Sequence, residues 1–164
     1  MDNAIVIKTA TQEDAAVIAA LAKEIWTQHY TPIIGVEQIE YMLNKFQSQS
    51  AVKADISGGY TYYIAYLRGS ACGYSAVRQD SGVFLSKFYV KQNVRGQGVG
   101  KAMLRAINAY AKECSAHRIW LTCNKRNTNT LAVYQKLGFV KIDEVIADIG
   151  GGFMMDDFVL ELLL

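Results

Sequence analysis

A short glycine-rich segment holds the residues whose types and spacing most clearly suggest chemistry. Gly96, Gly98 and Gly100 occupy every second position between an apolar run and a helical pattern. Glycine loses more conformational freedom on folding than any other residue, so three in one loop need a reason. Glycines let backbone N–H groups approach phosphate oxygens, and a helix that begins there adds partial positive charge. With Arg95 beside them, these residues predict a site for a phosphorylated ligand.

Spacing distinguishes between three kinds of phosphate-binding loop. A P-loop has a glycine five positions before its Gly-Lys pair and Ser or Thr after it, but Arg95 and Ala102 stand at those positions. A dinucleotide fingerprint GxGxxG that starts at Gly96 ends on Lys101 instead of glycine. What remains is a strand, then Arg-x-x-Gly-x-Gly, then a helix. Taken alone, this pattern is equally compatible with a plain tight turn.

The elements that must position this loop follow from hydrophobic periodicity. The stretch "VFLSKFYV" before it is apolar on both faces, as in a central strand that is covered on both sides. Residues 99–114 after it carry an apolar stripe of helical period. Further helices are predicted at 11–28, 36–47 and 127–137, and strands at "IVIK", "YTYYIAYLR", "SACGYSAVR", "RIWLTC", "FVKIDEVIA" and "FMMDDFVLEL". We expect a mixed α/β fold with a twisted mixed sheet of about seven strands and about four helices, in a single domain over residues 1–164.

Local signals predict several element boundaries. Thr11 with Asp14 three residues later forms the pattern of a capping box at a helix start. The stretch "TPIIG", which contains the only proline of the chain, predicts the end of that first helix. Gly138 is expected to end the helix of residues 127–137 in the C′ position.

Composition excludes several classes of protein. The formal net charge is +2 and 20% of residues are charged, which is not the strongly basic balance of a nucleic-acid-binding domain. The first residues lack the pattern of a signal peptide, and no apolar run approaches the length of a membrane span. Three cysteines without a CxxC pair indicate neither disulfides nor a zinc site. We therefore expect a reduced, cytoplasmic protein without a bound metal.

Charge is distributed unevenly along the chain. Residues 81–112 contain no acidic residue but carry Lys87, Lys91, Arg95, Lys101, Arg105 and Lys112. From residue 141 onward one lysine faces Asp143, Glu144, Asp148, Asp156, Asp157 and Glu161. An acid-free segment around the glycines favours an anionic ligand there, and the acid-rich end favours a cationic second ligand. A solvated surface is the alternative for each single charge.

A second motif lies downstream of the glycines. In "NTNTLAVYQKLGF", Asn127 and Tyr134 are seven residues apart and therefore lie on one face of a helix. With the order strand, Arg-x-x-Gly-x-Gly loop, helix, strand and Asn-to-Tyr helix, the chain resembles the GNAT superfamily of acyl-CoA N-acyltransferases, nearest to its bacterial polyamine and small-amine N-acetyltransferases. The resemblance is specific over residues 83–140 and looser over the rest of the chain.

The resemblance implies that acetyl-CoA is the co-substrate. In the family the loop amides bind the CoA pyrophosphate, and the pantetheine arm lies between two splayed parallel strands, here "LSKFYV" and "IWLTC". The residues implied in cofactor binding are Phe88, Tyr89, Val90, Arg95, Gly96, Gln97, Gly98, Val99, Gly100, Lys101, Asn127 and Tyr134. Asn127 has the alternative of serving as a helix N-cap.

The implied reaction is direct attack of an amine on the thioester carbonyl. Tyr134 matches the residue that gives a proton or a hydrogen bond to the departing CoA sulfur, with a core tyrosine as the alternative. A backbone N–H near Phe88 to Val90 would bind the developing oxyanion. An alkylammonium has a pKa of about 10.4 and is almost fully protonated at neutral pH. A base or a relay of waters must therefore remove a proton before attack.

The base is where this sequence departs from the family. Many members carry a carboxylate on the central strand, but Ser86 and Lys87 stand at the matching positions. The base is therefore left unassigned among the candidates Glu24, His29, Tyr30 and Asp148.

The acceptor is less defined than the cofactor. By resemblance it lies between "IWTQHYTPIIG" and "DIGGGFMMDD". The leading hypothesis is acetyl transfer to a small primary amine, with polyamines as the first candidates. A peptide or protein amine is the second enzymatic reading, and the missing strand carboxylate prompts a third, a non-catalytic acyl-CoA sensor. The resemblance implies no nucleic-acid or membrane partner and leaves a homodimer open, since many members are dimers.

Overall fold

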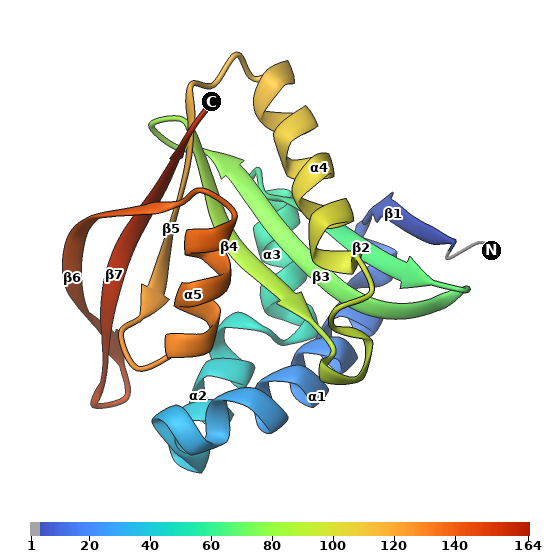
Figure 1. Cartoon of the computed structure of the whole chain (residues 1–164). Coiled ribbons are helices and arrows are strands. Elements are labelled where there is room, and N and C mark those ends of the chain that lie inside the picture. The colour runs from blue at the N-terminus through green and yellow to red at the C-terminus, as the bar shows by residue number, and fades with distance from the viewer. Residues whose placement is uncertain (1–3) are drawn as a thin grey trace.

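The computed structural model describes residues 4–164, which form one seven-stranded sheet with helices on both faces (Figure 1). The strands are β1 (Ile5–Thr9), β2 (Thr61–Leu67), β3 (Ser70–Gln79), β4 (Val83–Val90), β5 (Arg118–Asn124), β6 (Val140–Gly150) and β7 (Phe153–Leu163). Their order across the sheet is β1-β2-β3-β4-β5-β7-β6. In the described chain β4 and β5 pair in parallel and the other neighbours are antiparallel. The predicted mixed sheet of seven strands is confirmed.

In residues 4–164 five α-helices cover the sheet, one more than the sequence patterns predict. They are α1 (Ala15–Ile34), α2 (Val36–Phe46), α3 (Gln49–Ser57), α4 (Val99–Glu113) and α5 (Thr128–Lys136). Residues of α1, α2 and α3 share a core with β2 and β3, around Ile18, Ile64 and Tyr74. On the other face α4 packs against β3, β4 and β5, around Leu85 and Ile107. Within residues 4–164 no helix is both long and apolar enough to cross a lipid bilayer.

The first helix is longer than "TPIIG" predicts. It begins as expected, with Asp14 Oδ2 accepting a 2.8 Å bond from the Thr11 amide, and a 3₁₀ turn at Gln12–Asp14 precedes it. It then continues through Pro32 to Ile34 and ends at Gly35, whose φ is +87°. Pro32 cannot donate an amide to the Gln28 carbonyl, and the helix ends two residues later. The extra turn holds Tyr30 and Ile34 against the core that α1 shares with β2 and β3.

Helix α3 was missed in the sequence because its apolar face is narrow. Val52 is its one buried side chain. Its start is nevertheless signalled by Ser48, whose hydroxyl accepts a 3.2 Å hydrogen bond from the Ala51 amide. Such a cap stabilises a short helix that hydrophobic periodicity alone does not reveal.

Strands β4 and β5 pair only briefly before they separate. Their described partners are Val83 with Ile119 and Phe84 with Trp120, although both strands continue for several more residues. On its other side β4 pairs with β3, where Leu85 faces Val77 and Lys87 faces Ala76, so Ser86 is an extra residue that has no partner. A bulge of this kind bends its strand. The bend and the lost pairing together open the sheet between β4 and β5.

Candidate active site

A cavity of about 850 Å³ lies where β4 and β5 separate. Its walls come from the glycine loop, from β4 between Phe84 and Val90, and from β5 between Leu121 and Asn124. Helices α1, α2 and α5 and the β6–β7 hairpin supply the remaining walls. Because unpaired edges of both strands face this space, an extended ligand that carries amide groups can bond to the backbone there.

The cavity brings together most of the residues that the sequence assigns to cofactor binding. The lining includes Phe88, Tyr89, Val90, Arg95, Gly96, Val99, Gly100 and Tyr134. Four predicted residues lie outside the lining, namely Gln97, Gly98, Lys101 and Asn127. The first three belong to the same loop and helix start, and Asn127 acts on the cavity through its neighbours, as described below.

The glycine loop ends in a helix start that no side chain caps. Gly98 adopts a left-handed φ of 90° and α4 begins at the next residue, without an acidic residue in its first turn. The first intrahelical bond runs from the Ala102 amide to the Gly98 carbonyl over 3.1 Å. The amides of residues 99–101 therefore have no intrahelical acceptor, and they carry the positive end of the helix dipole. This arrangement binds anions well.

Gly100 differs from Gly98 in what a side chain would meet. A Cβ on Gly100 would contact only the Phe88 ring, at 4.0 Å, so a larger residue would extend into the cavity without a clash. Gly98 has similar space, with the nearest atom at 3.8 Å, but its positive φ makes any L side chain strained there. Gly98 is therefore needed for its backbone conformation, whereas Gly100 leaves the cavity open to a ligand.

Tyr134 lies in α5 with its ring against Phe88 of the cavity wall and Phe139 of the core. The centroid distances are 6.1 Å to Phe88 and 5.4 Å to Phe139. The side chain is 7% exposed, and its hydroxyl makes no hydrogen bond to residues 4–164. Burial raises the pKa of Tyr134 well above its ordinary value. The hydroxyl thus stays protonated and remains available as a donor.

Asn127 joins the start of α5 to α1. Its Oδ1 lies 3.0 Å from His29 Nε2, and its Nδ2 donates to the Tyr30 hydroxyl over 3.3 Å. The residue stands at the N-cap position of α5, as the alternative predicts, but its side chain makes no capping hydrogen bond there and bonds to α1 instead. Burial lowers the pKa of His29. In the neutral ring Nε2–H points to Asn127, which leaves Nδ1 without a proton.

Two of the four candidate bases lie away from the cavity. Glu24 is bound 3.4 Å from Lys91 Nζ, and Asp148 accepts a 2.8 Å bond from the Gly150 amide at the hairpin. Tyr30 does line the cavity, but burial raises its pKa and opposes its use as a base. Of the four, His29 combines access to the cavity with a free lone pair.

Lys87, at the position of the family's strand carboxylate, is buried and bound within the core. Its Nζ donates to the Phe46 carbonyl and to the Tyr62 hydroxyl, each at 2.6 Å, and lies 3.4 Å from Asp55 Oδ2. Burial lowers the pKa of Lys87 to about 8, against the opposing effect of Asp55. Lys87 therefore links β4 to α2 and α3. The cations between Lys87 and Lys112 consequently do not all face one anionic ligand.

Asp157, which is not among the four candidate bases, lies in the cavity wall. Asp157 of β7 is 8% exposed, and burial, followed by the nearby Asp156, raises its pKa to about 6. A signal for it was available. Neighbouring residues of a strand point to opposite faces, so one member of the pair Asp156–Asp157 had to point inward.

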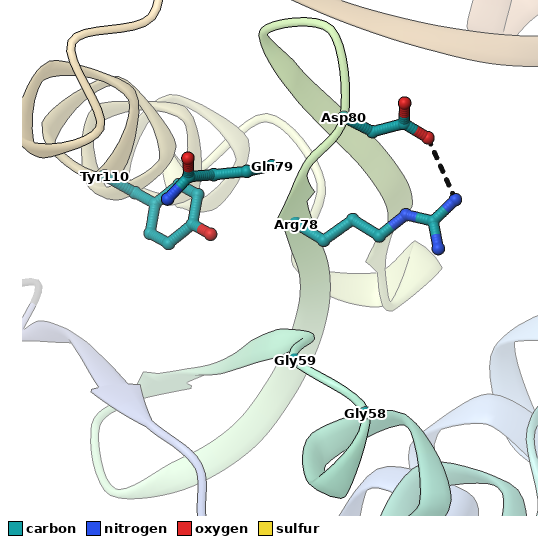
Figure 2. Close-up of a pocket in the computed structure, with 6 residues that line it drawn as sticks. All are labelled: Gly58, Gly59, Arg78, Gln79, Asp80 and Tyr110. Carbon is teal, nitrogen blue, oxygen red and sulfur yellow. Dashed lines mark hydrogen bonds and ion pairs between the residues drawn. The ribbon is translucent and has the colours of Figure 1, made fainter.

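A second cavity, of about 440 Å³, lies at the opposite end of α4 from the glycine loop. Figure 2 shows its lining, in which Arg78 and Asp80 form an ion pair of 3.0 Å and the side chains of Gln79 and Tyr110 point to the opposite side of β3 in this view. Both charges of the ion pair are neutralised within the chain. This cavity contains none of the predicted site residues.

The sequence places the chain in a known family. The profile of the acetyltransferase (GNAT) family matches residues 18–139, and the chain belongs to that family. Its fold is similar to that of the PaiA N-acetyltransferase from Thermoplasma acidophilum in complex with coenzyme A, with a TM-score of 0.83 at 20% identity, covering 98% of this chain and 99% of the other.

Curated relatives match at higher identity, in one case over less than half of the chain. The chain is 30% identical over 67 residues to the spermine/spermidine N(1)-acetyltransferase of Bacillus subtilis (strain 168), a match that covers 40% of this chain and 44% of that protein. It thus spans less than half the length of this relative. It is 25% identical over 150 residues to the aminoglycoside N(6')-acetyltransferase type 1 of Stenotrophomonas maltophilia, covering 85% of this chain and 89% of that protein.

Proposed function

We propose that this protein transfers the acetyl group of acetyl-CoA to a primary amine of a small molecule. The observation that carries the proposal is the cavity between β4 and β5, which starts at the uncapped N-terminus of α4. Anion-binding amides at one end and unpaired strand edges along the walls match the two chemical parts of CoA, a pyrophosphate and an amide-bearing arm.

Residues Arg95–Lys101 bind the pyrophosphate in this proposal. Free amides of the first turn of α4 supply hydrogen bonds, and Arg95 adds charge at the rim, where its Nε donates to the Val90 carbonyl over 3.3 Å. Gln97, Gly98 and Lys101 support the same loop from outside the lining. On β4, backbone N–H groups beyond Phe84 that point toward β5 are left without a strand partner. One of them, near Phe88 to Val90, is placed to bind the thioester oxygen as charge develops on it.

Tyr134 acts by hydrogen-bond donation to the departing sulfur. A thiol has a pKa of about 8.5, well below the raised pKa of Tyr134, so full proton transfer to the thiolate is unfavourable. A hydrogen bond that strengthens as charge gathers on sulfur still lowers the barrier. Asn127 positions this region, because it holds His29 and Tyr30 of α1 against the start of α5.

Two classes of amine are candidates for the acceptor. The name of the Bacillus relative supports a polyamine. The walls on the acceptor side support an amine with an apolar body, since that side of the cavity is lined by Ile34, Met42, Phe46, Ile149 and Met155. Burial of an apolar substrate surface there contributes about 25 cal/mol per Å².

A thiol-release assay tests the proposal. Purified protein is mixed with acetyl-CoA and with spermidine, kanamycin, 2-phenylethylamine or a short peptide in turn. Release of CoA that depends on one of the small amines supports the proposed function. Release with the peptide alone favours a peptide or protein acceptor. Calorimetric binding of acetyl-CoA without release in any mixture overturns the enzymatic proposal in favour of an acyl-CoA sensor.

A further inference from the structure

The carboxylate of Asp157 has an unusual position for a charged group. It lies on β7 opposite Asn124 of β5, in the wall of the cavity, and is 8% exposed. Its Oδ1 is buried and has no hydrogen-bond partner among residues 4–164. Thr122 forms a side-chain hydrogen bond with this carboxylate, but a carboxylate oxygen that stays buried without a partner is costly, and such an atom marks a place that a ligand or a reaction can use.

The chain does not supply a cation for Asp157. Lys125 is the nearby candidate, but its Nζ lies 2.9 Å from Asp156 and also bonds to Glu144. The two cations of the cavity wall are engaged elsewhere, since Lys87 is bound to Asp55 and Arg95 lies in the glycine loop. Within residues 4–164 Asp157 forms no salt bridge. A cationic partner for Asp157 must therefore come with a ligand.

Asp157 is also the one carboxylate in the described lining of the cavity. Its neighbour Asp156 points the other way, with 55% of its side chain exposed. Around Asp157 the lining continues with Tyr30 of α1 and Cys123 of β5, which places the carboxylate on the acceptor side.

We infer that Asp157 binds the ammonium group of the acceptor and takes up its proton before the amine attacks. The inference deepens the proposed function and rests on it. The proton moves from nitrogen to a carboxylate oxygen, leaving a neutral amine and a carboxylic acid. The nitrogen lone pair then forms the C–N bond, the C–S bond breaks, and the thiolate takes the proton that the new amide loses. Asp157 returns its own proton to solvent.

The surroundings of Asp157 suit a group that gains and loses a proton near neutral pH. Burial is the main cause that raises its pKa to about 6, and Asp156 adds to it. A hydrogen bond with Thr122 of β5 and the charge of Lys125, which follows β5, lower the pKa of Asp157, while Tyr30 and Cys123 face it as neutral groups at this pH. A carboxylate whose pKa is raised in this way accepts a proton more readily than an exposed carboxylate.

The test compares Asp157→Asn with the matched control Asp156→Asn, the same chemical change at the neighbouring exposed position. For whichever amine is turned over, we expect kcat/KM of Asp157→Asn to fall about a hundredfold, with the Kd for acetyl-CoA unchanged. Asp156→Asn should stay close to wild type, and Asp157→Glu should recover part of the activity. In wild type kcat/KM should fall below about pH 6, and this limb should disappear in Asp157→Asn.

A binding measurement separates failure of this inference from failure of the proposed function. Spermidine and 2-phenylethylamine are titrated calorimetrically into wild type and Asp157→Asn, each saturated with CoA. If wild type acetylates neither amine but binds one of them through Asp157, the proposed function fails and the ammonium site stands. Equal amine binding and equal kcat/KM in both proteins would overturn the inference, as would the absence of amine binding by wild type. So would an activity loss that merely follows a loss of folded protein, with the pH profile unchanged.

Discussion

At the end of the cavity formed by the glycine loop, the groups that face a ligand are mostly backbone amides, whereas at the end formed by α1, α2 and β7 they are side chains. The first end is built by consecutive residues, Arg95–Lys101, and its geometry follows from one turn and one helix start. The second end combines Tyr30, Phe46 and Asp157, which are far apart in the sequence. A backbone site recognises what all family members share, and a side-chain site is free to change with the acceptor.

The largest effect is expected where the two ends meet. Tyr134→Phe keeps the ring between Phe88 and Phe139 and removes only the hydroxyl. Because the proposed role of the hydroxyl is to donate to the developing thiolate, kcat should fall about a hundredfold while the Kd for acetyl-CoA changes little. Steady-state kinetics with calorimetry measures both quantities. If kcat is nearly unchanged and the melting temperature drops, Tyr134 is a packing residue and the catalytic role is wrong.

A change at the backbone end should affect cofactor binding alone. Gly100→Val places a branched side chain in the cavity beside Phe88, where nothing else obstructs it. We expect the Kd for acetyl-CoA to rise at least about tenfold, equivalent to about 1.4 kcal/mol. Ala109→Val adds a branched residue on an exposed face of the same helix and serves as the control. An unchanged Kd in Gly100→Val would remove the CoA site from this loop.

A change at the side-chain end should affect stability in a pH-dependent way. The folded-state pKa of Asp157 is about 6, above its ordinary value of 3.8, so the folded state binds its proton more tightly than the unfolded state. The charged carboxylate of Asp157 therefore lowers the free energy of unfolding above about pH 6. This effect disappears once the carboxyl group is protonated in both the folded and the unfolded state. Asp157→Asn should be more stable than wild type by about 1–3 kcal/mol at neutral pH. Denaturant unfolding should show the two proteins converging as the pH falls below the unfolded value. A variant that is less stable than wild type at neutral pH contradicts this account.

The smallest expected effect concerns the approach of the acceptor. Asp148 of β6 is exposed between Ala147 and Ile149 of the cavity wall and attracts cations over a Debye length of about 10 Å. If polyamines are the substrates, kcat/KM for spermidine should fall a few-fold as salt rises, while that for 2-phenylethylamine changes less. The measurement is kcat/KM for both amines at low and high salt. The same salt response for both would eliminate the polyamine candidate and leave the acetyltransferase proposal intact.

The same contrast explains what could be predicted from the sequence. The strand, loop and helix around Gly98 depend on local conformation and a regular apolar stripe, so their order and bounds were predicted closely. Helix α3 and the last turn of α1 were not, since Val52 alone marks the first and Pro32 argues against the second. Asp157 was noticed only as part of an acidic segment. Its burial depends on how α1 and β5 pack around it, which no local pattern encodes.

Ser86, the residue of β4 without a partner on β3, helps to determine how far β4 and β5 separate. Ser86 contributes length to the strand, and the residues on either side of it alternate in opposite phase, with Leu85 facing the α4 side and Tyr89 the α1 side. The bend that separates β4 from β5 thus depends on the number of residues and hardly on the identity of the extra one. A substitution of Ser86 and a deletion of Ser86 should therefore have different effects on the sheet. The first leaves the opening in place, and the second removes the bend while Leu85, Lys87 and Tyr89 keep their present partners and faces.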